Sequence, residues 1–215
     1  MKTLIICLMS LIIVATQAQE TRIFSLSPMT KNIQKVNGLV VGIGHFQEPD
    51  HVQTINGVNL DVMVFSPLIT VLAVMHGRVY DYPQDEKTKV VSNGLNLAIG
   101  GYMGDVEHNG LSVALYNIAN KSTGLGIHPA FNLTEKSVGT HISAFVNAGK
   151  YSQGLNVALY NRHEYMTGVQ IGVINKSLHL KGIQIGLFNR SKTLKGLQLG
   201  FINSNGKRTL PFINF

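Results

Sequence analysis

The most regular feature of the chain is an alternation of apolar and polar positions that recurs seven times between Gly110 and Asn203. Each copy begins with glycine and ends with asparagine, and the leading glycines are 14 or 15 residues apart. The copies are GLSVALYN (110–117), GLGIHPAFN (124–132), GTHISAFVN (139–147), GLNVALYN (154–161), GVQIGVIN (168–175), GIQIGLFN (182–189) and GLQLGFIN (196–203). This period is too short for a pair of helices and fits one strand plus one turn.

Within each regular copy the side chains fall into two classes that alternate with a period of two. Successive side chains of a strand point to opposite faces, so the pattern predicts strands with one aliphatic face. The opposite face carries small, polar and aromatic residues, and the closing asparagine is typical of turns. The aliphatic set comprises Leu111, Val113, Leu115, Leu155, Val157, Leu159, Val169, Ile171, Val173, Ile183, Ile185, Leu187, Leu197, Leu199 and Phe201.

The segment before Gly110 carries a looser version of the same pattern. Glycine opens GLVVGIGHF (38–46), GVNLDVMVF (57–65) and GLNLAIGG (94–101), and further strands are predicted over 68–80 and 209–215. The connections alternate between long ones, at 47–53 and 81–89, and short ones, at 66–67 and 104–109. The sequence therefore predicts an all-β fold with about twelve short strands.

Two architectures fit these strands. An antiparallel up-and-down β-barrel of the outer-membrane type explains the even strand number and the alternating connections, and its aliphatic face would meet lipid. The alternative is a β-solenoid with 14-residue coils, an aliphatic core and a ladder of the closing asparagines. We favour the barrel, because glycine on the exposed face of a solenoid would cost roughly 0.5 to 1 kcal/mol of backbone entropy without any packing. The barrel would also commonly end on an aromatic residue such as Phe215, although Pro211 requires an edge or a bulge there.

The N-terminus has the features of a secretory signal peptide. Lys2 precedes an apolar run over 4–15, and the small-residue site Thr16-Gln17-Ala18 follows. We predict a signal peptide over 1–18 and a single repeat-built β domain over 19–215, with the regular repeats at 110–203. The chain's one cysteine, Cys7, would leave with the signal. The predicted location is the outer membrane or the cell surface, with the periplasm or secretion as the alternative.

The charge of the chain is basic and uneven. The formal net charge is +7, and two acidic residues against eleven basic residues follow Gly110. Lysine in solvated turns explains most of this excess, but basic turns also suit anionic lipid headgroups. The basic segments lack the interleaved aromatic residues of a single-strand nucleic-acid binder, which argues against a nucleic-acid partner. Outer-membrane lipid is thus a candidate partner, and a protein partner is unknown.

Residue patterns that carry chemistry are scarce. The eight histidines include no pair at metal-ligand spacing, and the acidic cluster Asp81, Asp85 and Glu86 lacks the pattern of a calcium loop. No serine lies in a nucleophile-elbow context. We therefore predict no enzyme activity, no metal and no cofactor. The candidate residues are the structural repeat positions Gly110, Asn117, Gly124, Asn132, Gly139, Asn147, Gly154, Asn161, Gly168, Asn175, Gly182, Asn189, Gly196 and Asn203.

The unit LKGIQIGLFNRSKTLKGLQLGFIN (180–203), followed by PFINF (211–215), resembles the short-repeat surface proteins of Leptospira and Bacteroidetes-type bacteria. The resemblance extends from Gly38 to the C-terminus and is clearest after Gly154. It implies a cell-envelope or surface location and supplies no catalytic residues. The resulting prediction is a non-enzymatic envelope protein, either a barrel with a structural or minor pore role or a solenoid that acts as a binding module.

Overall fold

The computed structural model describes residues 20–45, 48–63, 65, 66, 68, 71, 72, 83 and 87–215. These residues form one sheet of twelve strands in chain order. The strands are β1 (Glu20–Ser27), β2 (Ile33–Gly42), β3 (Gln53–Asp61), β4 (Val90–Ala98), β5 (Val106–Ala114), β6 (Tyr116–His128), β7 (Phe131–Ser143), β8 (Val146–Val157), β9 (Tyr160–Ile171), β10 (Ile174–Ile185), β11 (Phe188–Ser204) and β12 (Thr209–Asn214). The all-β prediction is confirmed.

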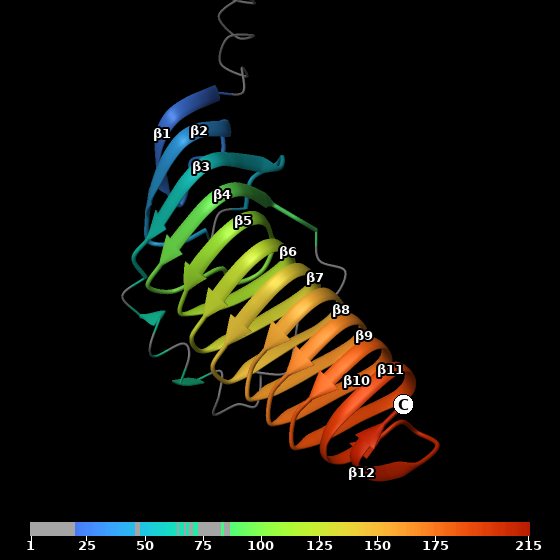
Figure 1. The fold of residues 1–215 in the computed structure, drawn as a ribbon. Helices are drawn as coiled ribbons and strands as arrows, with labels where there is room; N and C mark the ends of the chain where they lie inside the picture. Colours follow the sequence, from blue (N-terminus) through green and yellow to red (C-terminus); the bar gives the residue numbers. More distant parts are fainter. Residues whose placement is uncertain are drawn as a thin grey trace, which may run out of the picture.

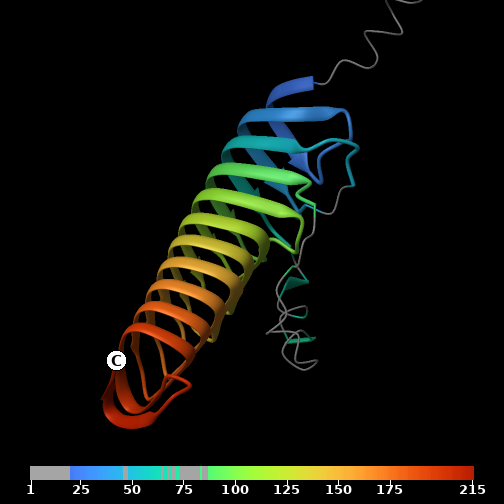
Figure 2. The same ribbon diagram turned by 90° about the vertical axis from the view of Figure 1, so that its right-hand side faces the viewer.

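The strand pairing identifies the fold as a β-solenoid. Strands β1 to β11 run parallel, each one paired with the next. Equivalent residues lie opposite one another, so that Gly168, Gly182 and Gly196 follow in register. Figures 1 and 2 show the resulting rod, in which successive coils stack along one axis. The antiparallel barrel is therefore wrong, and the solenoid alternative is the observed fold.

Each coil of the C-terminal half is one long strand that bends at its glycine. β10 has 12 residues and would extend about 40 Å if it were straight, yet it curves around the rod (Figure 1). At the bend Gly182 has a φ of 144°, and a Cβ there would clash with the carbonyl oxygen of Gly168. A side chain at this corner is thus excluded by both conformation and space.

Two of the three arguments that favoured the barrel fail for physical reasons. Gly186 was expected to lack packing in a solenoid, but a Cβ there would clash with the carbonyl oxygen of Gly172 in the preceding coil. The long connections do not reverse the chain, because they are insertions between coils that then continue in the same direction. Of the strand predicted over 68–80, Leu68, Val71 and Leu72 are helical instead, and the remainder lies outside the described residues.

The interior of the rod is polar, which reverses the arrangement expected for a solenoid. In the coil of β10 the buried side chains are Asn175, Ser177, Leu180 and Gln184, whereas Ile185 is 40% exposed. The expectation that the aliphatic face forms the core is therefore wrong. In the C-terminal coils, parallel, in-register stacking supplies inward amides such as Asn175 and Gln184 with an identical amide one coil away, so that their donors are buried with hydrogen-bond partners.

Apolar cores occur towards the N-terminal end and at one interior corner of the middle coils. The first cluster comprises Met29, Ile33, Val36, Val40, Ile55, Val90, Tyr102 and Val106. The second comprises Tyr116, Ala130, Phe131, Leu133, Val146 and Ala148. These clusters anchor the stack, and the C-terminal coils depend instead on amide ladders.

The C-terminal end of the rod is covered by β12. This strand pairs antiparallel with β11, the one antiparallel pair among the described strands, and their register shifts between Gly200 and Asn203. Pro211 lies in this edge strand, as its missing N–H requires. The C-terminal strand predicted over 209–215 is thus present, as a cap on a solenoid.

Candidate functional site

The repeat positions singled out from the sequence lie in two columns that run along the rod. The seven glycines are in register at one corner, and the asparagines from Asn117 to Asn189 are in register inside the rod. Asn203 joins the second column through its side chain, which accepts a hydrogen bond of 2.8 Å from Asn189. Both columns are part of the scaffold and face other coils.

Two amide ladders hold the C-terminal coils together. Asn161 donates to Asn175, and Asn175 to Asn189, in each case over 2.8 Å from Nδ2 to Oδ1. A parallel ladder runs through the glutamines, where Gln184 donates to Gln170 over 2.7 Å and Gln198 donates to Gln184 over 2.8 Å. The sequence predicted the asparagine ladder only for the solenoid alternative. It did not predict the glutamine ladder, although the recurrence of Gln two residues after glycine marks it.

Four buried histidines form an interior group that sequence analysis missed. His108, His128, His141 and His163 are each at most 2% exposed. The ring of His128 lies 3.2 Å from the hydroxyl of Ser112, and Nδ1 of His163 lies 2.9 Å from Nε2 of Gln170. The sequence contains a signal for these inward positions. Each histidine lies two or four residues from a repeat glycine or asparagine, and the inward glutamines likewise lie two residues after a repeat glycine.

Burial governs the protonation of these histidines. It lowers the pKa of His128 and His163 to about 3, with a smaller contribution from the neighbouring histidines. The pKa values of His108 and His141 fall to about 4, again chiefly through burial. All four rings are therefore neutral at pH 7, and they lie inside the stack. Among the described residues, no group of three His, Cys, Asp or Glu side chains is placed to hold a metal ion.

A second polar cluster lies near the N-terminal end and is satisfied internally. Asp61 receives hydrogen bonds from Ser27 over 3.0 Å and from Asn59 over 2.6 Å, and His45 Nε2 lies 3.3 Å from its carboxylate. Burial opposes ionisation of Asp61, but the hydrogen bonds and the charge of His45 outweigh it and lower the pKa of this carboxyl. Because its oxygens are engaged by neighbours, the cluster acts as a structural brace.

The exposed aliphatic side chains form the largest feature of the surface. The name aliphatic face is used below for the outward residues that follow each column glycine in the C-terminal coils: Leu155, Val157, Leu159, Val169, Ile171, Val173, Ile183, Ile185, Leu187, Leu197, Leu199 and Phe201. Leu187 is 54% exposed and Phe201 is 61% exposed. A shallow apolar groove runs along this face, lined by Leu159, Val173 and Leu187 among others.

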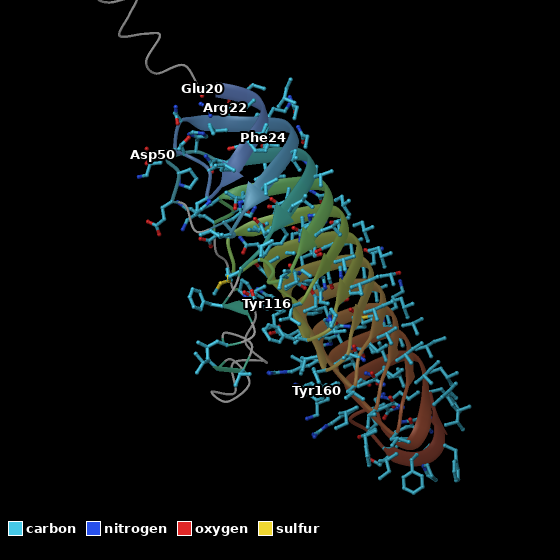
Figure 3. All side chains as sticks on the ribbon, turned by 90° about the vertical axis from the view of Figure 1, so that its left-hand side faces the viewer. Glu20, Arg22, Phe24, Asp50, Tyr116 and Tyr160 are labelled. Atoms are coloured by element: carbon cyan, nitrogen blue, oxygen red, sulfur yellow. The ribbon has the colours of Figure 1, made fainter. Side chains whose placement is uncertain are left out.

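The same outward rows continue towards the N-terminal coils. Leu111 and Leu125 are exposed at the position directly after their glycines, and Leu97 and Ile142 are exposed at the position two residues later. With coils about 4.8 Å apart, the eight coils that begin at Gly94 and end at Gly196 span about 34 Å. Figure 3 shows side chains projecting from the rod along its whole length. Contiguous apolar surface of this extent is typical of a contact surface.

Basic side chains border the aliphatic face on both sides. We call these residues the basic rows. Arg162, Lys176 and Arg190 are in register on one side, and Lys181 and Lys195 are in register on the other. All five are exposed. Lys176 Nζ lies 5.4 Å from the ring centroid of Tyr160. The first row also lines a groove that extends to Lys207 and Arg208.

Comparison of the chain with protein-family models, curated proteins and solved structures gives no match. The resemblance to short-repeat surface proteins accordingly stays a prediction. In the described part of the chain, no helix is both long enough and apolar enough to cross a bilayer. The signal peptide predicted over 1–18 and the acidic cluster Asp81, Asp85 and Glu86 lie outside the described residues.

Proposed function

We propose that the chain is a non-enzymatic interaction module, a β-solenoid that presents its aliphatic face to an apolar partner surface. The observation that carries this proposal is the inversion of the fold. The chain buries Asn175 and Gln184 and leaves Ile185 and Leu187 at the surface, over many consecutive coils. A minor pore role depended on the barrel and is not proposed.

The aliphatic face offers enough free energy for binding. Covering a fully exposed large apolar side chain contributes about 1.5 to 3 kcal/mol, so a side chain about 40% exposed such as Ile185 contributes roughly 1 kcal/mol. Association itself costs roughly 4 to 15 kcal/mol in lost translational and rotational freedom, so most of the aliphatic face has to be covered before binding is net favourable. The twelve residues of the aliphatic face in the C-terminal coils meet that requirement. The bent strands also hold these side chains in place before contact, which limits the entropy lost on binding.

The polar groups of the solenoid support a binding role over an enzymatic one. The histidines with lowered pKa, His108, His128, His141 and His163, are inside the stack and separated from the aliphatic face by the sheet. Catalysis requires titrating groups that converge on a space open to substrate. The signal peptide predicted over 1–18 and the resemblance to short-repeat surface proteins both favour an exported protein of the cell envelope or surface, which belongs to the same proposal.

Retention on a phenyl-substituted matrix tests the binding role of the aliphatic face. The test variant is Leu187→Asn, and the matched control is Leu178→Asn, because Leu178 is also exposed but lies on the opposite side of the coil. We expect Leu187→Asn to elute earlier than the parent protein and Leu178→Asn to elute with it. Circular dichroism checks that both variants keep the β-sheet. Equal elution of the two variants would contradict the proposal.

A further inference from the structure

We propose that the partner of the aliphatic face is the surface of an anionic lipid bilayer, an inference that rests on the proposed function. The aliphatic face would lie at the boundary between headgroups and acyl chains, and the basic rows would contact the anionic headgroups. This arrangement is that of an interfacial protein, which combines buried apolar area with electrostatic attraction.

The order of side chains around one coil places a basic residue at each margin of the aliphatic face. In the coil of β10 and β11, Lys181 precedes the outward residues Ile183, Ile185 and Leu187, and Arg190 follows them. Lys181 and Ile183 both point outward, and they lie directly before and directly after the bend at Gly182. The aliphatic face is therefore bordered by positive charge on both sides, the pattern expected at a negatively charged membrane surface.

The basic charge at one margin of the aliphatic face recurs from coil to coil. Arg162, Lys176 and Arg190 occupy equivalent positions in successive coils, which places like charges in consecutive layers of the stack. Like charges in consecutive layers repel one another. A layer of anionic headgroups supplies counter-charges along the whole row, while the long side chains keep their apolar stems at the aliphatic face.

Aromatic side chains lie at the border between the aliphatic face and the first basic row. Tyr160 and Phe188 occupy the same position in their coils, one residue after the last aliphatic position. Phe201 and Phe212 are strongly exposed near the C-terminal end. Aromatic rings favour the interface between water and lipid, where their bodies are apolar and their surroundings are polar.

A second copy of the chain fits the aliphatic face less well. Two solenoids that pack face to face would bring basic rows together at both margins, because each margin of the face carries lysine or arginine. Like charges placed opposite each other oppose association. A protein with acidic margins around an apolar surface is the remaining occupant, and the experiment below distinguishes it from lipid.

Tryptophan fluorescence with vesicles tests the inference, since the chain contains no tryptophan. Leu187→Trp places a reporter on the aliphatic face, and Leu178→Trp places a matched reporter on the opposite side. We expect vesicles of phosphatidylcholine and phosphatidylglycerol to shift the emission of the first reporter to the blue and to leave the second unchanged. Vesicles of phosphatidylcholine alone should bind more weakly, because the basic rows then lack counter-charges.

Charge variants of the Leu187→Trp reporter chain test the role of the basic rows. We expect Lys176→Gln with Arg190→Gln to weaken binding to the anionic vesicles roughly thirtyfold, since each basic residue near such a surface strengthens binding about fivefold. The charge-matched control is Lys121→Gln with Lys136→Gln, on the other side of the rod. An equal loss in the control would overturn the placement of the basic rows at lipid.

The outcomes separate the inference from the proposed function. Retention on the phenyl matrix without any blue shift on anionic vesicles would overturn the lipid partner and indicate a protein partner for the aliphatic face. A blue shift of the Leu178→Trp reporter alone would show that lipid contacts the side of the coil opposite the aliphatic face. That result would also overturn the inference. Equal elution of Leu187→Asn and Leu178→Asn from the phenyl matrix would contradict the proposed function itself.

Discussion

At the scale of single residues, Asn175 illustrates how a polar side chain is buried at little cost. Its Oδ1 accepts from Asn161 over 2.8 Å, and its Nδ2 donates to Asn189 over 2.8 Å and to the carbonyl oxygen of Ile185 over 2.9 Å. The residue is fully buried. Each partner is itself part of the scaffold, so removing the amide leaves donors and acceptors without partners in several coils.

Replacing Asn175 with alanine should destabilise the solenoid by about 2 to 3 kcal/mol, because the carbonyl oxygen of Ile185 and the neighbouring amides would be buried without partners. Urea unfolding followed by circular dichroism measures the change. Asn56→Ala is the matched control, since Asn56 also belongs to an asparagine ladder, with Asn37 and Asn93, but on the outside of the rod. Water replaces its partners there, so its loss should cost less than about 1 kcal/mol. Equal losses would show that the interior ladder contributes nothing specific.

The sequence predicts residue environments in part. The period of two correctly separates Ile185 from Gln184, and the asparagine ladder was foreseen for a solenoid. The alternation does not reveal which side faces inward. Hydropathy predicts that Ile185 faces the interior, but the stacking of identical amides places Gln184 there instead. That stacking depends on a partner one coil away, which the local pattern does not contain. His163 was overlooked for the same reason, since its inward position follows from Asn161.

At the scale of the coil, the middle of the rod differs from its C-terminal half. In the later coils Gln170, Gln184 and Gln198 continue one ladder. In the middle coils His141 replaces glutamine at the equivalent position, and its ring makes no hydrogen bond to another side chain within the described residues. The ladder is interrupted there, and neutral imidazoles fill the interior. These coils are therefore the acid-sensitive part of the stack.

Stability should fall as pH decreases below the unfolded histidine pKa of 6.5. A histidine whose folded pKa is about 3, such as His163, binds a proton in the unfolded chain but not in the folded one between these values. Its contribution is fully present above pH 6.5 and is lost progressively as pH falls towards 3. At about pH 5 the loss is roughly 2 kcal/mol for such a residue. Urea unfolding at neutral and acidic pH measures it.

His163→Ser is the informative variant for this prediction, because serine occupies the equivalent position in the next two coils, at Ser177 and Ser191. It should reduce the acid sensitivity by about one histidine's share, roughly 2 kcal/mol at about pH 5. Ser191→Ala is the control, which changes the interior without removing a titrating group. An unchanged pH dependence in His163→Ser would mean that its imidazole is protonated alike in folded and unfolded chains.

At the scale of the whole molecule, the sequence predicts strands but not their direction. A spacing of 14 residues is compatible with a turn that reverses the chain and gives antiparallel strands. It is equally compatible with a corner that keeps the winding direction and gives parallel strands. The register decides, because only parallel stacking places Asn161, Asn175 and Asn189 in one column with hydrogen bonds of 2.8 Å. The irregular connections of the N-terminal half favoured a barrel, since they alternate in length. In the solenoid they are insertions that leave the ladder intact.

The open ends of the rod define the last prediction. Exposed sheet edges pair with other chains unless they are covered, and β12 covers β11 at the C-terminal end. Asn214 continues the glutamine ladder by donating to Gln198 over 3.1 Å, and Arg208 Nε donates to Asn214 over 3.0 Å. Removing 208–215 would expose the unpaired edge of β11 together with both amide ladders.

The truncated chain should therefore associate end to end, and sedimentation velocity should show species larger than those of the full chain at equal concentration. Circular dichroism confirms that the remaining coils stay folded. Phe212→Asn is the control, because Phe212 is exposed and its replacement leaves the backbone pairing of β12 in place. Since that variant removes apolar surface and keeps the cap, it should sediment like the parent. A truncated chain that sediments like the parent would show that the edge of β11 is protected by something other than β12.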